Sequence, residues 1–237
     1  AVDEADEPYA LPRAAVIDDE VLRIFQAVGL DAAVLRDAQV QKSVTFVTNR
    51  GKKVEVLRPA HGELGHPPLV SIHQPSMERT MVAAIDERGR ADVRGGTRVE
   101  TVDRAADHVA VCVRPAAGGR ASRIRSRYMV ACDGGRSFVR RTLQIPFGGS
   151  TYSQRWLVLD GLLDKPLAKI PHPHFVGDIT RPTVSLPMSQ GRHRWEFMLH
   201  PGEDAAEFEQ ESRIRELAAP YLTDEQIEFE RAVVYTF

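Results

Sequence analysis

The stretch from Tyr128 to Leu143, which reads YMVACDGGRSFVRRTL, constrains the fold more than any other part of the sequence. Residues 128–132 form a short apolar run, which predicts a buried strand. Asp133 follows at the carboxyl end of that strand. Gly134 and Gly135 permit backbone angles that other residues resist, and they let a ligand approach the main chain closely. The stretch therefore predicts a strand followed by a glycine turn that is a candidate ligand site.

A helix is predicted directly after this turn. Ser137 is placed to cap it. Its apolar side chains are Phe138, Val139 and Leu143. Arg140 and Arg141 lie one turn in, so the amides of the helix start and two guanidinium groups can hold an anion such as a phosphate. An ordinary strand-to-helix turn with surface arginines fits the local pattern equally well, because glycine turns are common.

Three motifs resemble those of one enzyme family. The pattern DGxxSxxR from Asp133 to Arg140 resembles the "DG" motif of the FAD-dependent aromatic hydroxylases, which are single-component flavoprotein monooxygenases. The segment LPRA, which contains Arg13, resembles the place where a family arginine meets the flavin. The segment IHQP, which contains Gln74, resembles the family's flavin-contacting glutamine. The three matches occur in the family's order, and the likeness covers nearly the whole chain.

The resemblance implies a function and a set of site residues. The expected enzyme hydroxylates a phenolic aromatic acid with FAD, O2 and NADH or NADPH as reductant, since no side chain activates oxygen in this way. The cofactor-binding residues that the resemblance implies are Arg13, Gln74, Asp133, Gly134 and Arg140. Arg192, His193 and Arg194 are candidates for contact with a substrate carboxylate. A solvated cationic cluster beside a core tryptophan is the alternative for these three, and no catalytic side chain is named.

The predicted fold class is mixed α+β and α/β, the middle part of a FAD/NAD(P)-binding flavoprotein hydroxylase fold. A β-meander is predicted to lead into the DG turn, with strands at residues 97–104, 108–114 and 122–132. A mostly antiparallel substrate-domain sheet is predicted from strands at residues 44–48, 53–57, 156–159, 183–187 and 194–199. Helices are predicted over residues 18–28, 75–86 and 203–219.

These helices and strands are predicted to belong to two domains. Residues 1–36 and 71–150 are expected to form a partial FAD-binding domain, and residues 37–70 and 151–237 a substrate-binding domain. The sequence contains neither the GxGxxG fingerprint of dinucleotide binding nor the GDAAH stretch that the family uses near the flavin. The chain begins without methionine and stops inside the apolar run AVVYTF. These features predict an internal fragment of a longer hydroxylase.

The charge and composition of the chain limit the kinds of partner that it is expected to bind. The formal net charge of −2 creates no overall field that attracts nucleic acid or an anionic membrane. No apolar run approaches the ~20 residues that span a bilayer. Both cysteines, Cys112 and Cys132, fall in strand-like apolar runs, which predicts buried thiols and favours the cytoplasm. His61 and His66 lack further ligands at suitable spacing, so no metal site is predicted.

Two other functions stay open at this point. The chain can be a substrate-binding module that lacks flavin chemistry, or part of a polyketide or antibiotic hydroxylase with the same fold. The expected partner is a small aromatic substrate in every case. A homo-oligomer is compatible with the sequence, which does not fix the choice of phenol or of NADH over NADPH.

Overall fold

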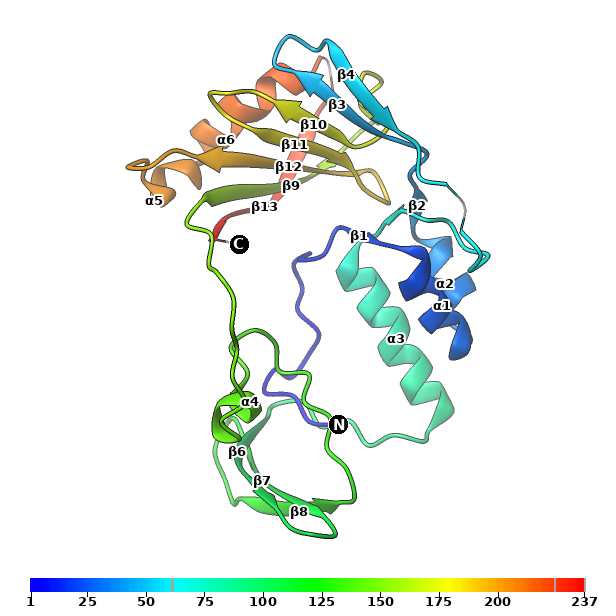
Figure 1. Ribbon diagram of the computed structural model, residues 1–237, viewed down its shortest axis with the longest axis vertical. Coiled ribbons are helices and arrows are strands. Elements are labelled where there is room, and N and C mark those ends of the chain that lie inside the picture. Colours follow the sequence, from blue (N-terminus) through cyan, green and yellow to red (C-terminus); the bar gives the residue numbers. More distant parts are fainter. Residues whose placement is uncertain (61, 224, 237) are drawn as a thin grey trace. The chain divides into compact units, whose positions relative to one another are not determined.

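The computed structural model describes residues 1–60, 62–223 and 225–236 (Figure 1). The chain forms two compact units. Residues Ala1–Tyr9 and Ile85–Ser150 make up the first, which we call the meander unit; Ala10–Ala84 and Thr151–Phe237 make up the second, the sheet unit. The bounds of these compact units differ from those of the predicted FAD-binding and substrate-binding domains, and that division stays a prediction.

The sheet unit contains a seven-stranded sheet with the strand order β13-β9-β12-β11-β10-β3-β4. Neighbouring strands pair antiparallel, except that β10 and β3 pair in parallel. The prediction of a mostly antiparallel sheet is therefore confirmed, although β10 was not predicted. The strands are β3 (Val44–Thr48), β4 (Lys53–Leu57), β9 (Arg155–Leu163), β10 (His174–Gly177), β11 (Thr183–Pro187), β12 (Arg192–Leu199) and β13 (Ile227–Thr236).

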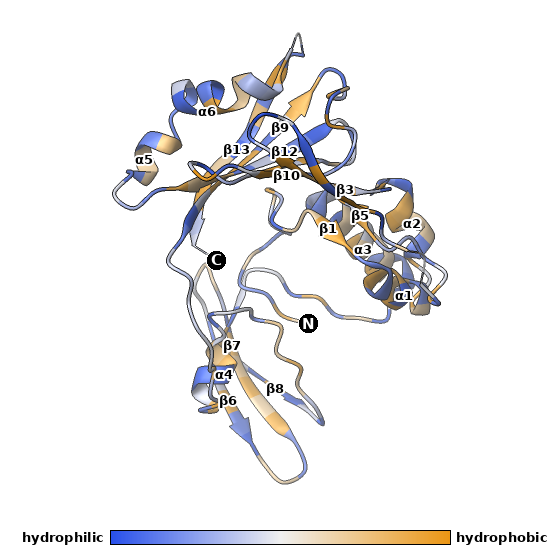
Figure 2. Ribbon diagram, turned by 45° about the horizontal axis from the view of Figure 1, so that its top comes forward, coloured by the Kyte–Doolittle hydropathy of each residue, from blue (hydrophilic) through white to orange (hydrophobic). Residues whose placement is uncertain are grey.

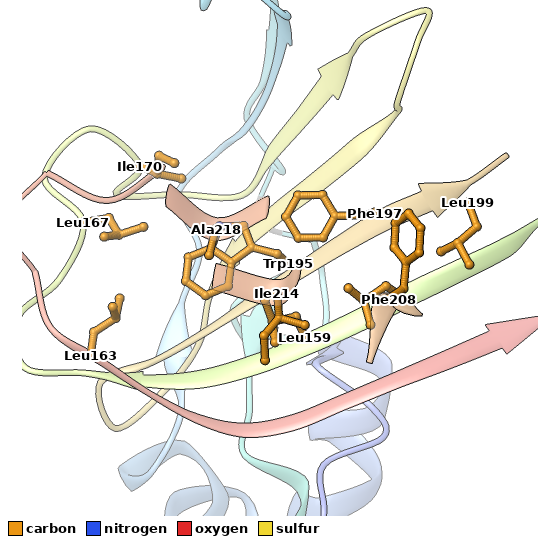
Figure 3. Packing of buried hydrophobic residues seen from close by; sticks show 11 residues of the cluster. Leu159, Leu163, Leu167, Ile170, Trp195, Phe197, Leu199, Phe208, Ile214 and Ala218 are labelled. Atoms are coloured by element: carbon orange, nitrogen blue, oxygen red, sulfur yellow. The ribbon is translucent and has the colours of Figure 1, made fainter. Parts of the chain in front are cut away.

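Helices α5 (Ala205–Phe208) and α6 (Glu211–Ala218) cover one face of this sheet, and a short 3-10 helix (Ala219–Tyr221) follows them. Because side chains alternate along a strand, Trp195 and Phe197 both point to this face. Figure 3 shows them packed with Leu159 of β9 and with Phe208 and Ile214 of the helices. Full burial of such large apolar side chains contributes about 1.5–3 kcal/mol each, so this layer is the main core of the sheet unit.

The helix predicted over residues 203–219 is wrong, because the chain breaks it into α5 and α6. Asp204 caps α5, its Oδ1 accepting from the backbone N–H of Ala206 at 3.0 Å, and Gln210 before α6 has extended backbone angles. At about 100° per residue, positions 208 and 214 of a continuous helix would point in different directions. The break lets both Phe208 and Ile214 face the sheet, where they are 1% and 5% exposed.

A smaller core lies elsewhere in the sheet unit, around Leu22, Val34 and Val70. The elements are a three-stranded sheet of β1 (Val16–Ile17), β5 (Val70–Ser71) and β2 (Gln39–Val40), and the helices α1 (Asp19–Ala27), α2 (Asp31–Arg36) and α3 (Gln74–Arg88). Asp18 caps α1, as predicted, by accepting from the backbone N–H of Val21 at 3.0 Å. From Ile85 onward α3 belongs to the meander unit.

The meander unit contains the predicted antiparallel meander. Its strands are β6 (Thr97–Arg104), β7 (Val109–Pro115) and β8 (Ser122–Ser126), and the short helix α4 (Phe138–Thr142) follows. Figure 2 shows the hydrophobic residues of β7, of which Val111 and Val113 are buried. The meander and the mostly antiparallel sheet together confirm the predicted fold class.

The buried strand predicted at residues 128–132 is wrong. These residues have no regular structure, and Tyr128 and Val130 are 82% and 84% exposed. A strand forms only where its backbone groups find a neighbour, and no described strand pairs with this segment. Cys132 is consequently exposed and Cys112 half-buried, so the prediction of two buried thiols is also wrong; both thiols are free.

Candidate functional site

The DG turn of the meander unit is built by hydrogen bonds of two side chains to the start of α4. The Asp133 carboxylate accepts from the backbone N–H of Val139 at 3.0 Å. The Ser137 hydroxyl accepts from the backbone N–H of Arg140 at 2.9 Å, which is the predicted cap. The hydrogen bond with Ser137, followed by that with the Val139 amide, holds the pKa of Asp133 below its usual value. Asp133 is therefore a carboxylate whose first task is to stabilise the turn.

The glycines of this turn leave the main chain open. Gly134 has a φ of +73°, a conformation that favours glycine, and a Cβ at Gly134 or Gly135 would meet no heavy atom within 4 Å. Arg140 closes one side, because its Nη1 donates to the carbonyl of Gly135 at 2.9 Å and its guanidinium lies 4.2 Å from the centre of the Phe147 ring. The fold thus brings Asp133, Gly134 and Arg140 together. Open main-chain amides beside an arginine fit the anionic diphosphate of FAD.

In the sheet unit, residues 12–14 are held from two sides by buried or half-buried side chains, an arrangement that we call the 12–14 clamp. On one side, the Gln74 side-chain oxygen accepts from the backbone N–H groups of Arg13 at 3.0 Å and of Ala14 at 2.7 Å. On the other side, Arg194 donates to the carbonyl of Arg13 at 2.8 Å. The fold therefore brings Arg13, Gln74 and Arg194 together, and Gln74 acts first on the backbone that carries Arg13.

The clamp is anchored in a buried ionic cluster. Arg194 donates two hydrogen bonds to Asp160, at 2.7 and 2.9 Å, and the side chains are only 4% and 1% exposed. Arg231 of β13 lies 4.0 Å from the same carboxylate, and both arginines donate to the carbonyl of Pro12. Two arginines share one carboxylate and two carbonyls, so loss of the carboxylate would leave buried positive charge uncompensated.

The three residues predicted for a substrate carboxylate do not form one group. Arg192 donates to Glu230 at 2.8 and 2.9 Å, and Arg194 belongs to the clamp. His193 points to the opposite face, because neighbouring side chains of a strand alternate. Its Nε2 lies 2.8 Å from the Ser185 hydroxyl, and burial lowers its pKa to about 3. A substrate contact for each stays a prediction.

Sequence reasoning missed three polar residues of the seven-stranded sheet. Asp160 interrupts the otherwise apolar run WLVLDGLL, and Arg231 directly precedes the apolar run AVV. A charged residue within or next to an apolar run of a strand is the signal that could have found them. Glu196 lies between Trp195 and Phe197, both of which face the core, so alternation alone places it on the other face. Burial raises the pKa of Glu196 above its usual value.

The described residues contain neither a candidate membrane-spanning helix nor a candidate metal cluster. No helix in residues 1–60, 62–223 and 225–236 has the length and apolar character needed to cross a membrane. Nor does this part of the chain gather three or more His, Cys, Asp or Glu side chains suited to a metal ion. His61, half of the histidine pair considered from the sequence, lies outside the described residues.

The chain is similar in sequence to one protein family and to curated enzymes. The family model described as "FAD binding domain" matches residues 1–232. The chain is 33% identical over 236 residues to a 3-(3-hydroxy-phenyl)propionate/3-hydroxycinnamic acid hydroxylase of Escherichia coli O8 (strain IAI1), and 34% identical to one of Klebsiella pneumoniae (strain 342). Each match covers 99% of this chain but 42% of the relative, so the chain spans less than half the length of these curated relatives.

Two solved structures have the same fold. The p-nitrophenol 4-monooxygenase of Pseudomonas putida DLL-E4 aligns with a TM-score of 0.87 at 20% identity, over 99% of this chain and 60% of that chain. Aklavinone-11 hydroxylase, in complex with FAD and aklavinone, aligns with a TM-score of 0.78 at 18% identity, over 100% of this chain and 48% of that chain. The chain belongs to the FAD-binding-domain family of the FAD-dependent aromatic monooxygenases, and the resemblance predicted from its motifs is confirmed.

Proposed function

We propose that the protein containing this chain is a flavin-dependent monooxygenase that hydroxylates a phenolic aromatic acid, with FAD, NADH or NADPH, and O2. The observation that carries the proposal is the DG turn, in which Asp133 and Ser137 fix an open glycine main chain beside Arg140 within a family of FAD-binding domains. The relatives from Escherichia coli and Klebsiella pneumoniae are named for two hydroxyphenyl acids, which supports this substrate class.

Each unit, taken by itself, carries candidate residues for the cofactor. The main chain at Gly134 and the guanidinium of Arg140 suit the diphosphate, and Asp133 keeps that turn in shape. Arg13 is the candidate for the flavin, and Gln74 fixes its backbone. When bound, FAD supplies the redox chemistry with O2 that no side chain provides. The chain's own contribution is to bind the cofactor, orient the substrate and exclude water.

The test compares flavin retention and substrate-stimulated NADH or NADPH oxidation in the FAD-loaded protein. We expect Asp133→Ala to lower both clearly, because the DG turn loses its fixed shape. Arg13→Ala and Gln74→Ala should lower flavin retention by smaller amounts, since each removes one contact or one support. The matched control is Arg123→Ala, which removes an exposed meander arginine. A parent protein that retains no flavin and oxidises no reductant with any phenolic acid would overturn the proposal.

A polyketide or antibiotic hydroxylase is the weaker candidate. Its support is the fold shared with aklavinone-11 hydroxylase at 18% identity, whereas the hydroxyphenyl acid hydroxylases are about one third identical to this chain. Oxidation of NADH stimulated by a polyketide and not by a hydroxyphenyl acid would favour it. A cytoplasmic location and a homo-oligomer remain predictions.

A further inference from the structure

The face of the seven-stranded sheet that points away from α5 and α6 carries one row of residues that are direct neighbours across six strands. The pairings Phe46 with Phe175, Phe175 with Val184, Val184 with Glu196, Glu196 with Val158, and Val158 with Val233 are all in register. Directly opposed residues point to the same side of a sheet. The row is therefore a band of apolar side chains with a single carboxyl group, that of Glu196, inside it.

Glu196 is the charged residue among the apolar side chains of this row. Its side chain is half-buried between Val158 and Val184, and burial disfavours its ionised form. The nearest arginine along the same face of β12, Arg194, gives its hydrogen bonds to Asp160 and to backbone carbonyls. Within the described residues no hydrogen bond or ion pair joins the Glu196 carboxyl. A half-buried carboxyl without a partner costs stability, and such groups concentrate at binding sites.

The apolar neighbours indicate what the missing partner is. The rings of Phe46 and Phe175 are stacked with centres 5.3 Å apart, and Phe175 is 41% exposed, so the row presents an aromatic surface that Val184 separates from the carboxyl. A carboxyl group accepts hydrogen bonds, and it repels a second carboxylate. The arrangement suits an aromatic ring that lies on apolar side chains and donates a hydrogen bond, which is the chemistry of a phenol.

We infer that Glu196 is the specificity-determining residue that accepts the hydrogen bond of the substrate's ring hydroxyl. The inference rests on the proposed function and deepens it, because it assigns the selection of phenols over unsubstituted rings to one side chain. A site built to bind a hydroxyl discriminates strongly against an analogue that lacks it, since its polar group is then left without a partner. The acid group of the substrate lies away from Glu196.

The experiment measures binding rather than turnover. In the FAD-loaded protein without reductant, the change in flavin absorbance is titrated with 3-(3-hydroxyphenyl)propionate and with 3-phenylpropionate, which lacks the hydroxyl. We expect the parent to bind the phenol more tightly. Glu196→Met keeps the length of the side chain and should weaken phenol binding about 10- to 100-fold, the loss expected when the phenol's buried hydroxyl is left without an acceptor, with little change for 3-phenylpropionate.

Two further variants make the outcome decisive. Glu196→Gln keeps an acceptor oxygen and should retain most of the preference for the phenol. This variant also serves as the test if Glu196→Met fails to fold. Met198 lies on the same face of β12 as Glu196, and Met198→Leu should leave the ratio of the two dissociation constants unchanged. A parent that prefers the phenol, with the same preference in Glu196→Met, overturns this inference alone. A parent that loads FAD but binds no phenolic acid overturns the proposed function as well.

Discussion

Two arginine–carboxylate pairs, one in each unit, have similar donor–acceptor distances in very different surroundings. In the sheet unit Arg194 donates to Asp160 at 2.7 and 2.9 Å, with the side chains 4% and 1% exposed. In the meander unit Arg98 donates to Glu4 at 2.9 and 2.6 Å, with the side chains 59% and 61% exposed. Water screens the second pair and not the first, so burial rather than distance sets the energy at stake.

The contrast extends to what each unit's arginines do. In the sheet unit, Arg194 and Arg231 fix the backbone of residues 12–14 and cannot leave it without exposing a buried charge. In the meander unit, Arg140 lies on an exposed turn whose glycine main chain is open. The buried arginines of the sheet unit therefore hold backbone in place, whereas Arg140 of the meander unit lies where a ligand can reach it.

The largest expected effect comes from breaking the buried pair. Asp160→Asn leaves two buried arginines without their carboxylate, and we expect a loss of about 3–5 kcal/mol in the free energy of unfolding. Both tryptophans, Trp156 and Trp195, belong to the sheet unit, so their fluorescence during urea unfolding reports this unit alone. Asp103→Asn, which breaks an exposed pair with Arg123, is the control. Equal losses of stability for the two variants would show that burial of the ion pair does not determine its contribution to stability.

Acid should weaken the sheet unit through His193. Burial lowers its pKa from 6.5 to about 3, so the folded state favours neutral imidazole. The stability that this provides is complete above about pH 6.5 and is lost as the pH falls toward about 3, with a slope of at most about 1.4 kcal/mol per pH unit. Between pH 7 and 5, tryptophan-detected stability should fall in the parent and stay flatter in His193→Gln. His108→Gln in the meander is the matched control, and a slope unchanged by His193→Gln would contradict the assignment.

A smaller, local effect is expected at the start of α4. Ser137→Ala removes the hydroxyl that accepts from the backbone N–H of Arg140, and loss of such a cap costs about 0.5–2 kcal/mol. Hydrogen exchange at the Arg140 amide should accelerate accordingly, while tryptophan-detected unfolding of the sheet unit stays the same. Ser137→Thr keeps the hydroxyl and should restore slow exchange. If Ser137→Ala shifted the tryptophan-detected transition as well, the two units would unfold as one.

Local signals in the sequence were sufficient for much of the fold. Asp18 and Ser137 cap helices because each is a short polar residue directly before an apolar helical run. The strand predicted at residues 183–187 matches the observed bounds of β11, Thr183–Pro187. The apolar run at residues 128–132 carries the same local signal, yet it is exposed, because a strand also needs a neighbour that the local pattern does not reveal.

The candidate site depends on contacts between distant parts of the chain. Arg13 and Gln74 were found through motifs, but their hydrogen bonds join positions that no local pattern connects. The partners of Arg194, Asp160 and the carbonyl of Pro12, lie far from it in sequence for the same reason. The only relevant signal in the sequence itself is the alternation of side chains along a strand. Alternation places His193 and Arg194 on opposite faces of the sheet, with Glu196 on the same face as Arg194.

The smallest expected effect comes from the exposed pair with which the comparison began. Glu4→Gln removes the charge that faces Arg98, and exposed pairs contribute about 0–1 kcal/mol. The backbone N–H of Asp3 still donates to Arg94, and that of Thr97 still donates to Asp3, so the first residues stay attached without the pair. Hydrogen exchange of the Thr97 amide should change little, and the difference from the parent should vanish in 1 M salt, where screening acts within about 3 Å. A loss that persists in high salt would mean that Glu4 acts through its hydrogen bonds with Arg98 and not only through its charge, and the two pairs would then differ by more than their exposure to water.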